Sequence, residues 1–480
     1  VRNSGKTPDA PKPHLTTLLR AFDLRYGDTV YVDTGTYGLI QPILLSAVDG
    51  VGLGNDYGFT LTGPDDPSFV AMVMPLTAEV AGESLITFDN AAGITFSHLS
   101  LTGGYYGLEV VNSAAVTLDT LHVYDNTDDG VHLDTLSGNI MITGGAYHDN
   151  GDIGIYLGSN SGGNNTISDL SVYSNGDEGI YITSSGTITG VEAYNNTDEG
   201  IYFYNGWVST ENRWGVISNN TIYGNGDNGL YAESTATVAS GLSVLVSDNT
   251  VYDNYRRGMY LYAGGPSGDW FALVASGNSV TQSTNSSSNE ALYAYNVLVT
   301  GNDITGGDED GVKAYDRSVV RGNVIHESDG RGVYSDHSAQ IIGNRIWGHS
   351  GSGIEARGSS SAVGNLVYGN LIGIHAVSAP ANISNNVVYG NTDVGIRIDG
   401  DSNSGMVIAN NTVHQSTGRA IDVMGSTQNL VLRNNILVVD GGHGIYVDDN
   451  SQIGFDSDYN LFEIAGGALA GYWQGYQVTV

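Results

Sequence analysis

The chain contains no cysteine, and only 17 of its 480 residues are Lys or Arg, against 51 Asp or Glu. Without cysteine the chain has neither a disulfide framework nor a thiolate site. A formal net charge of -34 leaves no basic face for phosphate, so nucleic acid is not expected as a partner. No apolar run reaches about 18 residues, so we expect no membrane insertion. The acidity favours solubility in salt and divalent-cation binding at Asp-rich turns.

Proline is also rare, with 9 residues, whereas glycine is abundant, with 68. This balance suits many tight turns rather than a disordered or collagen-like chain. One unit returns along the chain, as in VYSNGDEGIYIT and VYGNGDNGLYAES: an apolar–Tyr pair, a turn of Asn, Gly and Asp, then Gly-apolar-X-apolar. Most steps of the repeat are 20 to 25 residues. Such a period, made of short strands and turns, predicts a solenoid. The marker residues before the apolar pair are Gly107, Gly130, Gly154, Gly179, Gly200, Gly229, Gly258, Ala291, Gly311, Gly332, Gly353, Gly373, Gly395, Ala420 and Gly444.

A second series, of asparagines mostly 21 residues apart, supports the same register. An Asn at one turn of every coil can pass its amide hydrogen bond to the Asn above and below. We therefore predict an internal amide ladder; the alternative is a set of ordinary turn asparagines. Its members are Asn278, Asn302, Asn323, Asn344, Asn365, Asn386, Asn411 and Asn435.

The two ends differ from the repeat. In LTTLLRAFDL, apolar residues from Leu15 to Phe22 follow helical spacing. We predict a lead-in and capping helix over 1–24, a parallel β-helix over 25–455 and a partial cap, or exit to a missing segment, over 456–480. A cap covers the apolar side chains and strand edges of a terminal coil. The start at Val1 without a signal peptide leads us to expect part of a longer polypeptide.

Several stretches interrupt the period. Irregular early coils and a surface loop at GPDDPS are expected within 41–95. Longer steps predict insertions at 205–216, 264–271 and 282–290, the first two with exposed tryptophans. These tryptophans are Trp207, Trp214 and Trp270.

A helix followed by GDTVYVDTGTY, and then GxGIY-type repeats, resembles right-handed parallel β-helix proteins of the pectin-lyase-like superfamily. Many of these proteins are secreted polysaccharide lyases and epimerases. The resemblance covers nearly the whole chain. It implies an all-β, right-handed parallel β-helix of about 15 coils with a short N-terminal capping helix. With the acidity, it also implies a secreted or cell-surface bacterial protein.

One coil, DEDGVKAYDRSVVRGNVIHESDG, resembles the catalytic coil of chondroitinase and alginate lyases of the β-helix type. The resemblance implies Lys313 as a base and Asp308 as a calcium-binding acid. The family's other acid falls on Gly306. The family's arginine falls on Tyr334 or the residue after it, with only His337 nearby.

In the repeat, alternation sends the two apolar residues inward, while X and the residue after the second apolar one face solvent. X is Tyr in six successive coils from Tyr156 to Tyr293. Aromatic faces stack on sugar rings and phenols bond to sugar hydroxyls, so we predict a polysaccharide-binding face. The alternative is a stripe of tyrosines stacked on one another. The predicted substrate-binding residues are Tyr231, Tyr260, Tyr262, Tyr293, Tyr295, Tyr334, Glu355 and His375.

Six of the seventeen basic residues lie between Lys313 and Arg357. Proton abstraction beside a uronate carboxylate needs a base and a cation or Ca²⁺. Candidate catalytic residues are Lys313, Tyr315 and His337, with Arg357 as carboxylate anchor. Candidate ligands for Ca²⁺, the expected cofactor, are Asp308, Asp310 and Asp336. The alternative is that charges on neighbouring strands pair, with Glu355 between Lys313 and Arg397.

Taken together, the sequence predicts an extracellular β-helix module of a larger secreted or cell-surface protein. This module is a scaffold with a tyrosine-lined face for a polysaccharide or other glycan. The alternative is a Ca²⁺-dependent polysaccharide lyase or uronate epimerase acting on an acidic glycan. The sequence leaves open whether the protein is an enzyme.

Overall fold

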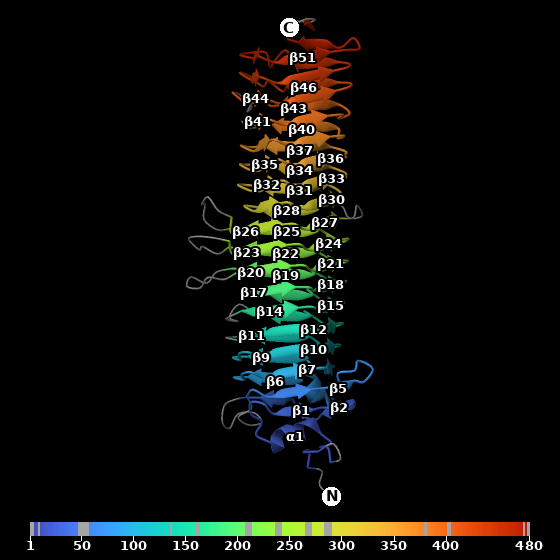
Figure 1. The fold of residues 1–480 in the computed structure, drawn as a ribbon. Coiled ribbons are helices and arrows are strands. Elements are labelled where there is room, and N and C mark those ends of the chain that lie inside the picture. The colour runs from blue at the N-terminus through green and yellow to red at the C-terminus, as the bar shows by residue number, and fades with distance from the viewer. Residues whose placement is uncertain are drawn as a thin grey trace. The chain divides into compact units, whose positions relative to one another are not determined.

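A computed structural model gives the fold of the chain (Figure 1). It is an all-β parallel β-solenoid of about 15 turns, as predicted. The chain divides into two compact units, Val1–Ala232 (unit 1) and Glu233–Val480 (unit 2). The structure describes residues 4–7, 10–46, 57–134, 137–158, 164–206, 214–235, 242–264, 271–282, 290–378, 382–400, 405–473 and 476–477.

Each regular coil of unit 1 contributes two strands to one parallel sheet (sheet A) and one strand to a second (sheet B). The sheet A strands are β1 (Thr29–Tyr31), β2 (Gly35–Leu39), β4 (Thr60–Thr62), β5 (Ala71–Pro75), β7 (Thr95–Ser97), β8 (Ser100–Thr102), β10 (Thr117–Tyr124), β12 (Met141–His148), β14 (Asn165–Ser168), β15 (Ser171–Tyr173), β17 (Gly186–Thr189), β18 (Glu192–Tyr194), β20 (Gly215–Ser218) and β21 (Thr221–Tyr223). The sheet B strands are β3 (Ile43–Leu45), β6 (Ile86–Asp89), β9 (Leu108–Val111), β11 (Val131–Asp134), β13 (Ile155–Leu157), β16 (Ile180–Ile182), β19 (Ile201–Asn205) and β22 (Leu230–Ser234), whose last residues belong to unit 2.

Unit 2 repeats this plan. Its sheet A strands are β23 (Val244–Ser247), β24 (Thr250–Tyr252), β26 (Leu273–Ser276), β27 (Ser279–Gln282), β29 (Leu298–Thr300), β30 (Asp303–Gly306), β32 (Val319–Arg321), β33 (Val324–His326), β35 (Gln340–Ile342), β36 (Arg345–Trp347), β38 (Ser361–Val363), β39 (Leu366–Tyr368), β41 (Ile383–Ser384), β42 (Val387–Tyr389), β44 (Val407–Ala409), β45 (Thr412–Gln415), β47 (Val431–Arg433), β48 (Ile436–Val439), β50 (Asp456–Asp458) and β51 (Leu461–Ile464). Its sheet B strands are β25 (Met259–Ala263), β28 (Leu292–Tyr295), β31 (Asp310–Tyr315), β34 (Arg331–Ser335), β37 (Ser352–Arg357), β40 (Ile372–Val377), β43 (Val394–Asp399), β46 (Arg419–Met424), β49 (His443–Val447), β52 (Leu469–Tyr472) and β53 (Tyr476–Gln477).

The apolar pair of each repeat lies in the core, as predicted. Ile180 and Ile182 of β16 pair with Ile201 and Phe203 of β19, and all four side chains are buried. Burial of each such side chain stabilises the fold by roughly 1.5–3 kcal/mol. The marker position is glycine because the next coil comes close: a Cβ on Gly179 would lie 2.6 Å from the carbonyl oxygen of Gly200.

The predicted amide ladder of unit 2 is confirmed. The side chain of Asn323 donates to Oδ1 of Asn344 at 3.0 Å, and the backbone N–H of Asn323 donates to the same oxygen at 2.9 Å. Sequence reasoning missed a second buried ladder, in unit 1, although each repeat carries Asn at that turn. Its members are Asn126, Asn150, Asn175, Asn196 and Asn225.

The helical spacing near the N-terminus is confirmed by α1 (Leu15–Ala21), which buries Leu15 and Leu19. A second helix, α2 (Ala78–Ala81), lies in the irregular early coils, and GPDDPS forms no strand. At the other end, β50, β51 and β52 continue the parallel pairing, and β53 runs antiparallel to β52. The boundaries 1–24, 25–455 and 456–480 stay predictions.

Most of the predicted insertions lie outside the described residues. This includes Trp207, Trp270 and all of 282–290 except its two end residues. Trp214 is described and its side chain is exposed, as expected. In the part of the chain that the structure covers, neither helix has the length and apolar character needed to cross a bilayer.

Candidate functional site

The predicted outward column of unit 2 is held in register on sheet B. Residues one repeat apart in the sequence are paired on neighbouring parallel strands, so they form a row across the sheet. The order is Tyr260, Tyr293, Lys313, Tyr334, Glu355 and His375, with Tyr262, Tyr295 and Tyr315 in the parallel column. Tyr231 belongs to unit 1, where its ring stacks on Tyr202.

Tyrosine rings within one column are stacked, whereas rings that meet between the two columns are tilted. Tyr260 and Tyr293, in one column, lie parallel, with ring centroids 4.7 Å apart and 1° between planes. Between the columns the angle is 38° for Tyr293 and Tyr315 and 57° for Tyr315 and Tyr334. A stacked ring has its faces covered by its neighbours and presents its edge and hydroxyl. The tilted ring of Tyr315 is therefore the one best placed to offer a face, because the guanidinium of Arg331 lies over the ring of Tyr334, 4.4 Å from its centroid.

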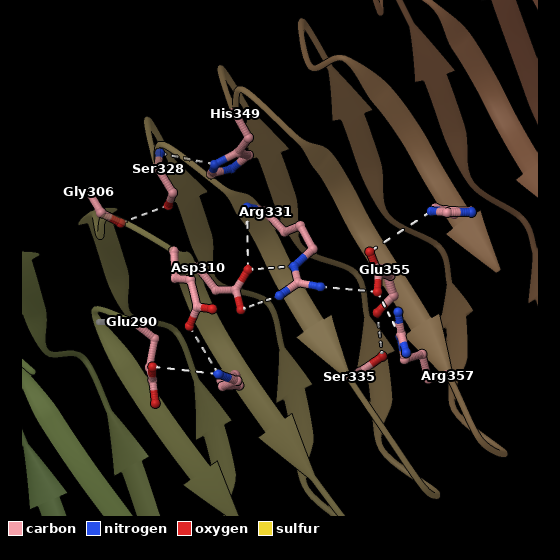
Figure 2. A network of polar contacts seen from close by, with 12 residues as sticks. Glu290, Gly306, Asp310, Ser328, Arg331, Ser335, His349, Glu355 and Arg357 are labelled. Carbon is pink, nitrogen blue, oxygen red and sulfur yellow. Dashed lines mark hydrogen bonds and ion pairs between the residues drawn. The ribbon is translucent and has the colours of Figure 1, made fainter. Parts of the chain in front are cut away.

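Arg331 is the centre of the polar network beside these rings (Figure 2). Its Nε and Nη2 donate to the two oxygens of Asp310 at 2.7 and 3.0 Å. Its Nη1 donates to Oε1 of Glu355 at 3.1 Å, and Nε of Arg357 donates to the same oxygen at 2.7 Å. A bidentate guanidinium–carboxylate pair of this kind is both strong and directional.

Burial and neighbouring charges have opposite effects on the pKa values of Asp310 and Glu355. Burial raises the pKa of Asp310, and Arg331 offsets part of this shift. Burial also acts to raise the pKa of Glu355, but Arg331 and Arg357 outweigh it, and the pKa is lowered. Glu355 is thus held as a carboxylate between two arginines. It is buried rather than solvent-facing, contrary to the expectation for its column, because these side chains cover it.

Lys313 lies in a second group of charges. Its Nζ is 3.1 Å from Oε2 of Glu309 and 3.9 Å from Oε2 of Glu290. Glu290 is buried, accepts from Nε of Arg257 at 2.7 Å, and keeps Oε2 without a hydrogen-bond partner. Lys313 is also 5.9 Å from the ring centroid of Tyr334.

Charge pairing between neighbouring strands is therefore present, with partners that differ from the predicted ones. Glu355 pairs with Arg331 and Arg357, whereas Arg397 pairs with Asp422 of the next coil, from Nε to Oδ2 at 3.1 Å. Sequence reasoning missed the importance of the position just before the marker residue. In four successive coils of unit 2 the residue at that position is charged: Arg257, Glu290, Asp310 and Arg331. Arg257 pairs with Glu290, and Arg331 pairs with Asp310.

The structure brings only part of the predicted catalytic set together. The cations of Lys313, Arg331 and Arg357 all lie within 5.9 Å of the Tyr334 ring centroid. Burial, and then the neighbouring Tyr334, raise the pKa of Tyr315 to about 12. Its phenol is neutral at neutral pH and suits a hydrogen-bond donor better than a base.

The two histidines of the prediction occupy different settings. His337 lies in the turn after β34 with 67% of its side chain exposed, and its Nδ1 is 3.7 Å from Asp336. His375 is half-buried in β40, and burial lowers its pKa. Nδ1 of His375 is 3.9 Å from Glu355, and its Nε2 has no hydrogen-bond partner. The catalytic roles stay predictions.

Two of the three predicted calcium ligands have other partners, and the assignment of Asp308, Asp310 and Asp336 stays a prediction. Both oxygens of Asp310 already accept hydrogen bonds from Arg331, and Asp336 lies beside His337. Within the described residues, acids close enough to share an ion occur in unit 1 instead, with ligand atoms within 4.8 Å of one another. The three groups are Asp128, Asp129 and Asp152; Asp177, Glu178 and Asp198; and Asp198, Glu199 and Asp227.

Unit 1 also carries two aromatic stacks, and only the first was predicted. On sheet B, successive ring centroids are 4.4 to 5.4 Å apart, and on sheet A 4.6 to 5.2 Å. The apolar–Tyr pair of the repeat was the signal for the second stack. The sheet B stack contains Tyr106, His132, Tyr156, Tyr181, Tyr202 and Tyr231. The sheet A stack contains Tyr124, His148, Tyr173, Tyr194 and Tyr223.

The fold and the repeat together define a parallel β-helix protein. The sequence model of the right-handed beta helix region matches residues 84–238, 208–372 and 337–480, so the chain belongs to this family. A comparison with curated proteins gives no match.

Solved structures with a similar fold include proteins of different kinds. The A-module of the mannuronan C-5 epimerase AlgE4 from Azotobacter vinelandii is 12% identical, with 94% of this chain and 91% of that chain covered and a TM-score of 0.25. The N-terminal fragment of gene product 12 from bacteriophage phi29 is 13% identical, with 92% and 88% covered and a TM-score of 0.47. The tailspike of E. coli bacteriophage HK620, solved with a pentasaccharide, is 13% identical, with 91% and 72% covered and a TM-score of 0.35. At these TM-scores the likeness carries no argument about function.

Proposed function

We propose that the chain is an extracellular β-helix module that binds a polysaccharide on sheet B of unit 2, where the tyrosine rings turn between Tyr293 and Tyr334. The observation that carries this proposal is that Tyr315 is tilted by 57° to Tyr334 of the neighbouring column, whereas rings within one column are stacked, as Tyr260 and Tyr293 are at 1°. A turned phenol offers both a face for the apolar side of a sugar ring and a hydroxyl for its polar edge. We further propose that the module belongs to a secreted or cell-surface bacterial protein, where polysaccharides are available as partners.

The charges beside the turned rings favour a glycan that carries carboxylates. Arg357 uses Nε for Glu355, and 43% of its side chain is exposed, which leaves its terminal nitrogens for a ligand. Lys313 lies on the same row. A planar guanidinium suits a carboxylate because it can donate two parallel hydrogen bonds. Local cations on a chain of net charge -34 would confine an acidic glycan to this place.

The arrangement supports binding better than lyase or epimerase chemistry. Proton abstraction needs a base that is free of its proton near neutral pH. The pKa of Tyr315 is raised to about 12, and Lys313 is ion-paired with Glu309. Both groups fit hydrogen-bond donation to a bound sugar.

The test is a glycan array followed by calorimetric titration of the full chain with the best ligand. We expect Tyr315→Ala and Arg357→Ala each to weaken binding about tenfold or more, as for anchors at the centre of an interface. Tyr181→Ala is the matched control, because Tyr181 of unit 1 stacks on a tyrosine on either side. Unchanged affinity in Tyr315→Ala, or no bound glycan at all, contradicts the proposal. Release of unsaturated uronates, seen by ultraviolet absorbance, would instead support the lyase.

A further inference from the structure

Unit 1 contains buried acids in a stretch of sequence without Lys or Arg. No Lys or Arg occurs between Arg25 and Arg213. Glu178 and Glu199 are nevertheless buried in successive coils, each just before the marker glycine. A buried carboxylate is costly unless an opposite charge accompanies it.

The last of the acidic groups lies at the turns before β19 and β22. One oxygen each of Asp198, Glu199 and Asp227 lies within 4.8 Å of the others. The amide of Asn228 reaches into this group, because its Nδ2 donates to Oε1 of Glu199 at 2.8 Å and to Oδ2 of Asp227 at 3.0 Å. Three carboxylates and one amide thus converge from two coils.

A second and separate observation concerns the other end of that amide. Asn228 is 2% exposed, and its Oδ1 is buried without a hydrogen-bond partner. A buried acceptor left without a hydrogen bond is unfavourable for folding. A half-turn of the amide would place this oxygen where Nδ2 now lies, between Glu199 and Asp227. An amide oxygen beside carboxylates is a ligand set for a hard divalent cation.

Unit 2 shows how the chain otherwise treats buried acids at this position. Asp310 forms an ion pair with Arg331, and Glu290 forms one with Arg257. Asp422, in the outward column, forms ion pairs with Arg397 and Arg419. Among the described residues of unit 1, no Lys or Arg lies in the coils next to Glu199. A cation from solution would balance its charge.

We propose that Asp198, Glu199, Asp227 and Oδ1 of Asn228 bind one divalent cation of the calcium class and so join two successive coils of unit 1. All four donors are oxygens, which favour Ca²⁺ over metals that prefer nitrogen or sulfur. An ion that binds the folded state alone raises the melting temperature as its concentration rises. This site is separate from the proposed glycan face and does not depend on it.

Calorimetric titration with Ca²⁺ of the full chain, first stripped with a chelator, tests this proposal together with thermal melts. We expect saturable binding and a higher melting temperature. In Glu199→Gln and Asp227→Asn, binding at one site should weaken at least tenfold. Asn228→Ala keeps all three carboxylates and should also weaken that site about tenfold. Asp303→Asn in unit 2, with 62% of its side chain exposed, is the control and should leave binding unchanged.

Three outcomes would overturn the proposal. The first is a melting temperature that does not respond to Ca²⁺ but rises on acidification, which would mean that the acids hold protons instead. The second is Ca²⁺ binding that persists unchanged in both acid variants. The third is a loss of binding in the control equal to that in the variants. Far-ultraviolet circular dichroism verifies that every variant is folded.

Discussion

His349, at a buried turn of unit 2, should make this part of the fold less stable in acid. His349 is 3% exposed. Its ring points toward Ser328 (Figure 2). Its Nδ1 accepts from the backbone N–H of Ser328 at 3.1 Å, and its Nε2 lies 3.2 Å from the carbonyl oxygen of Ile325 and so carries the hydrogen. Its backbone N–H donates to Oδ1 of Asn370 at 3.0 Å. A neutral imidazole thus supplies one acceptor and one donor, as an asparagine amide does in the ladder.

Protonation would put a hydrogen on the nitrogen that faces the Ser328 N–H and would bury a charge. Burial, the largest cause, lowers the pKa of His349 from 6.5 to about 4. Above pH 6.5 both folded and unfolded chains carry neutral histidine, so stability does not change on this account. As the pH falls further, the unfolded chain takes up the proton first. Stability then drops by about 1.4 kcal/mol per pH unit, to a loss of roughly 3 kcal/mol near pH 4.

The assay compares urea unfolding of the wild type and His349→Asn near pH 7 and near pH 4. Carboxylates titrate in both proteins, so the difference between the two pH dependences isolates the histidine. We expect the variant to lose roughly 2–3 kcal/mol less on acidification. Because solenoid repeats can unfold in segments, hydrogen exchange at the Ser328 and His349 amides should be followed as well. His337→Asn, at an exposed turn, is the control. Equal acid sensitivity of wild type and His349→Asn would refute the reasoning.

Three further substitutions test the buried polar groups. Asn344→Ala removes the link to the carbonyl oxygen of Val320 at 2.8 Å and leaves neighbouring ladder groups unpaired, so urea unfolding should show a loss of about 1–3 kcal/mol. Arg331→Ala leaves Asp310 buried without its partner and should cost about 3–5 kcal/mol, with partial recovery when Asp310→Asn is added; no recovery in thermal melts would contradict the pairing argument. Burial raises the pKa of Glu199 to about 8, so the folded chain keeps a proton that the unfolded chain has lost. With chelator present, wild-type stability should therefore fall as the pH rises from about 5 to 8, and Glu199→Gln should fall less.

The periodic features of this fold could be predicted because the repeat itself fixes them. Glycine before an apolar pair, and asparagine at a constant spacing, gave the parallel strands, the core and the amide ladder. The partner of each charge could not be predicted in the same way. A side chain such as Arg331 can reach along its own column, or toward Glu355 on the next strand, and the choice depends on rotamers rather than on spacing. The ring planes of Tyr315 and Tyr334 likewise have no signature in the sequence.

The position just before the marker residue connects these observations. It is buried in many coils yet often polar, so each charge placed there needs a partner from a neighbouring coil or from solution. In unit 2 this position holds arginines and acids that pair with each other. In unit 1 the polar residues at this position are Asp129, Glu178, Glu199 and Asn228, within a stretch almost free of Lys and Arg. Asp129 pairs with His132, whereas Glu199 is left to a proton or a bound cation. Replacing Asn228 by Arg tests this directly, because an internal cation beside Glu199 should remove the response of the melting temperature to Ca²⁺.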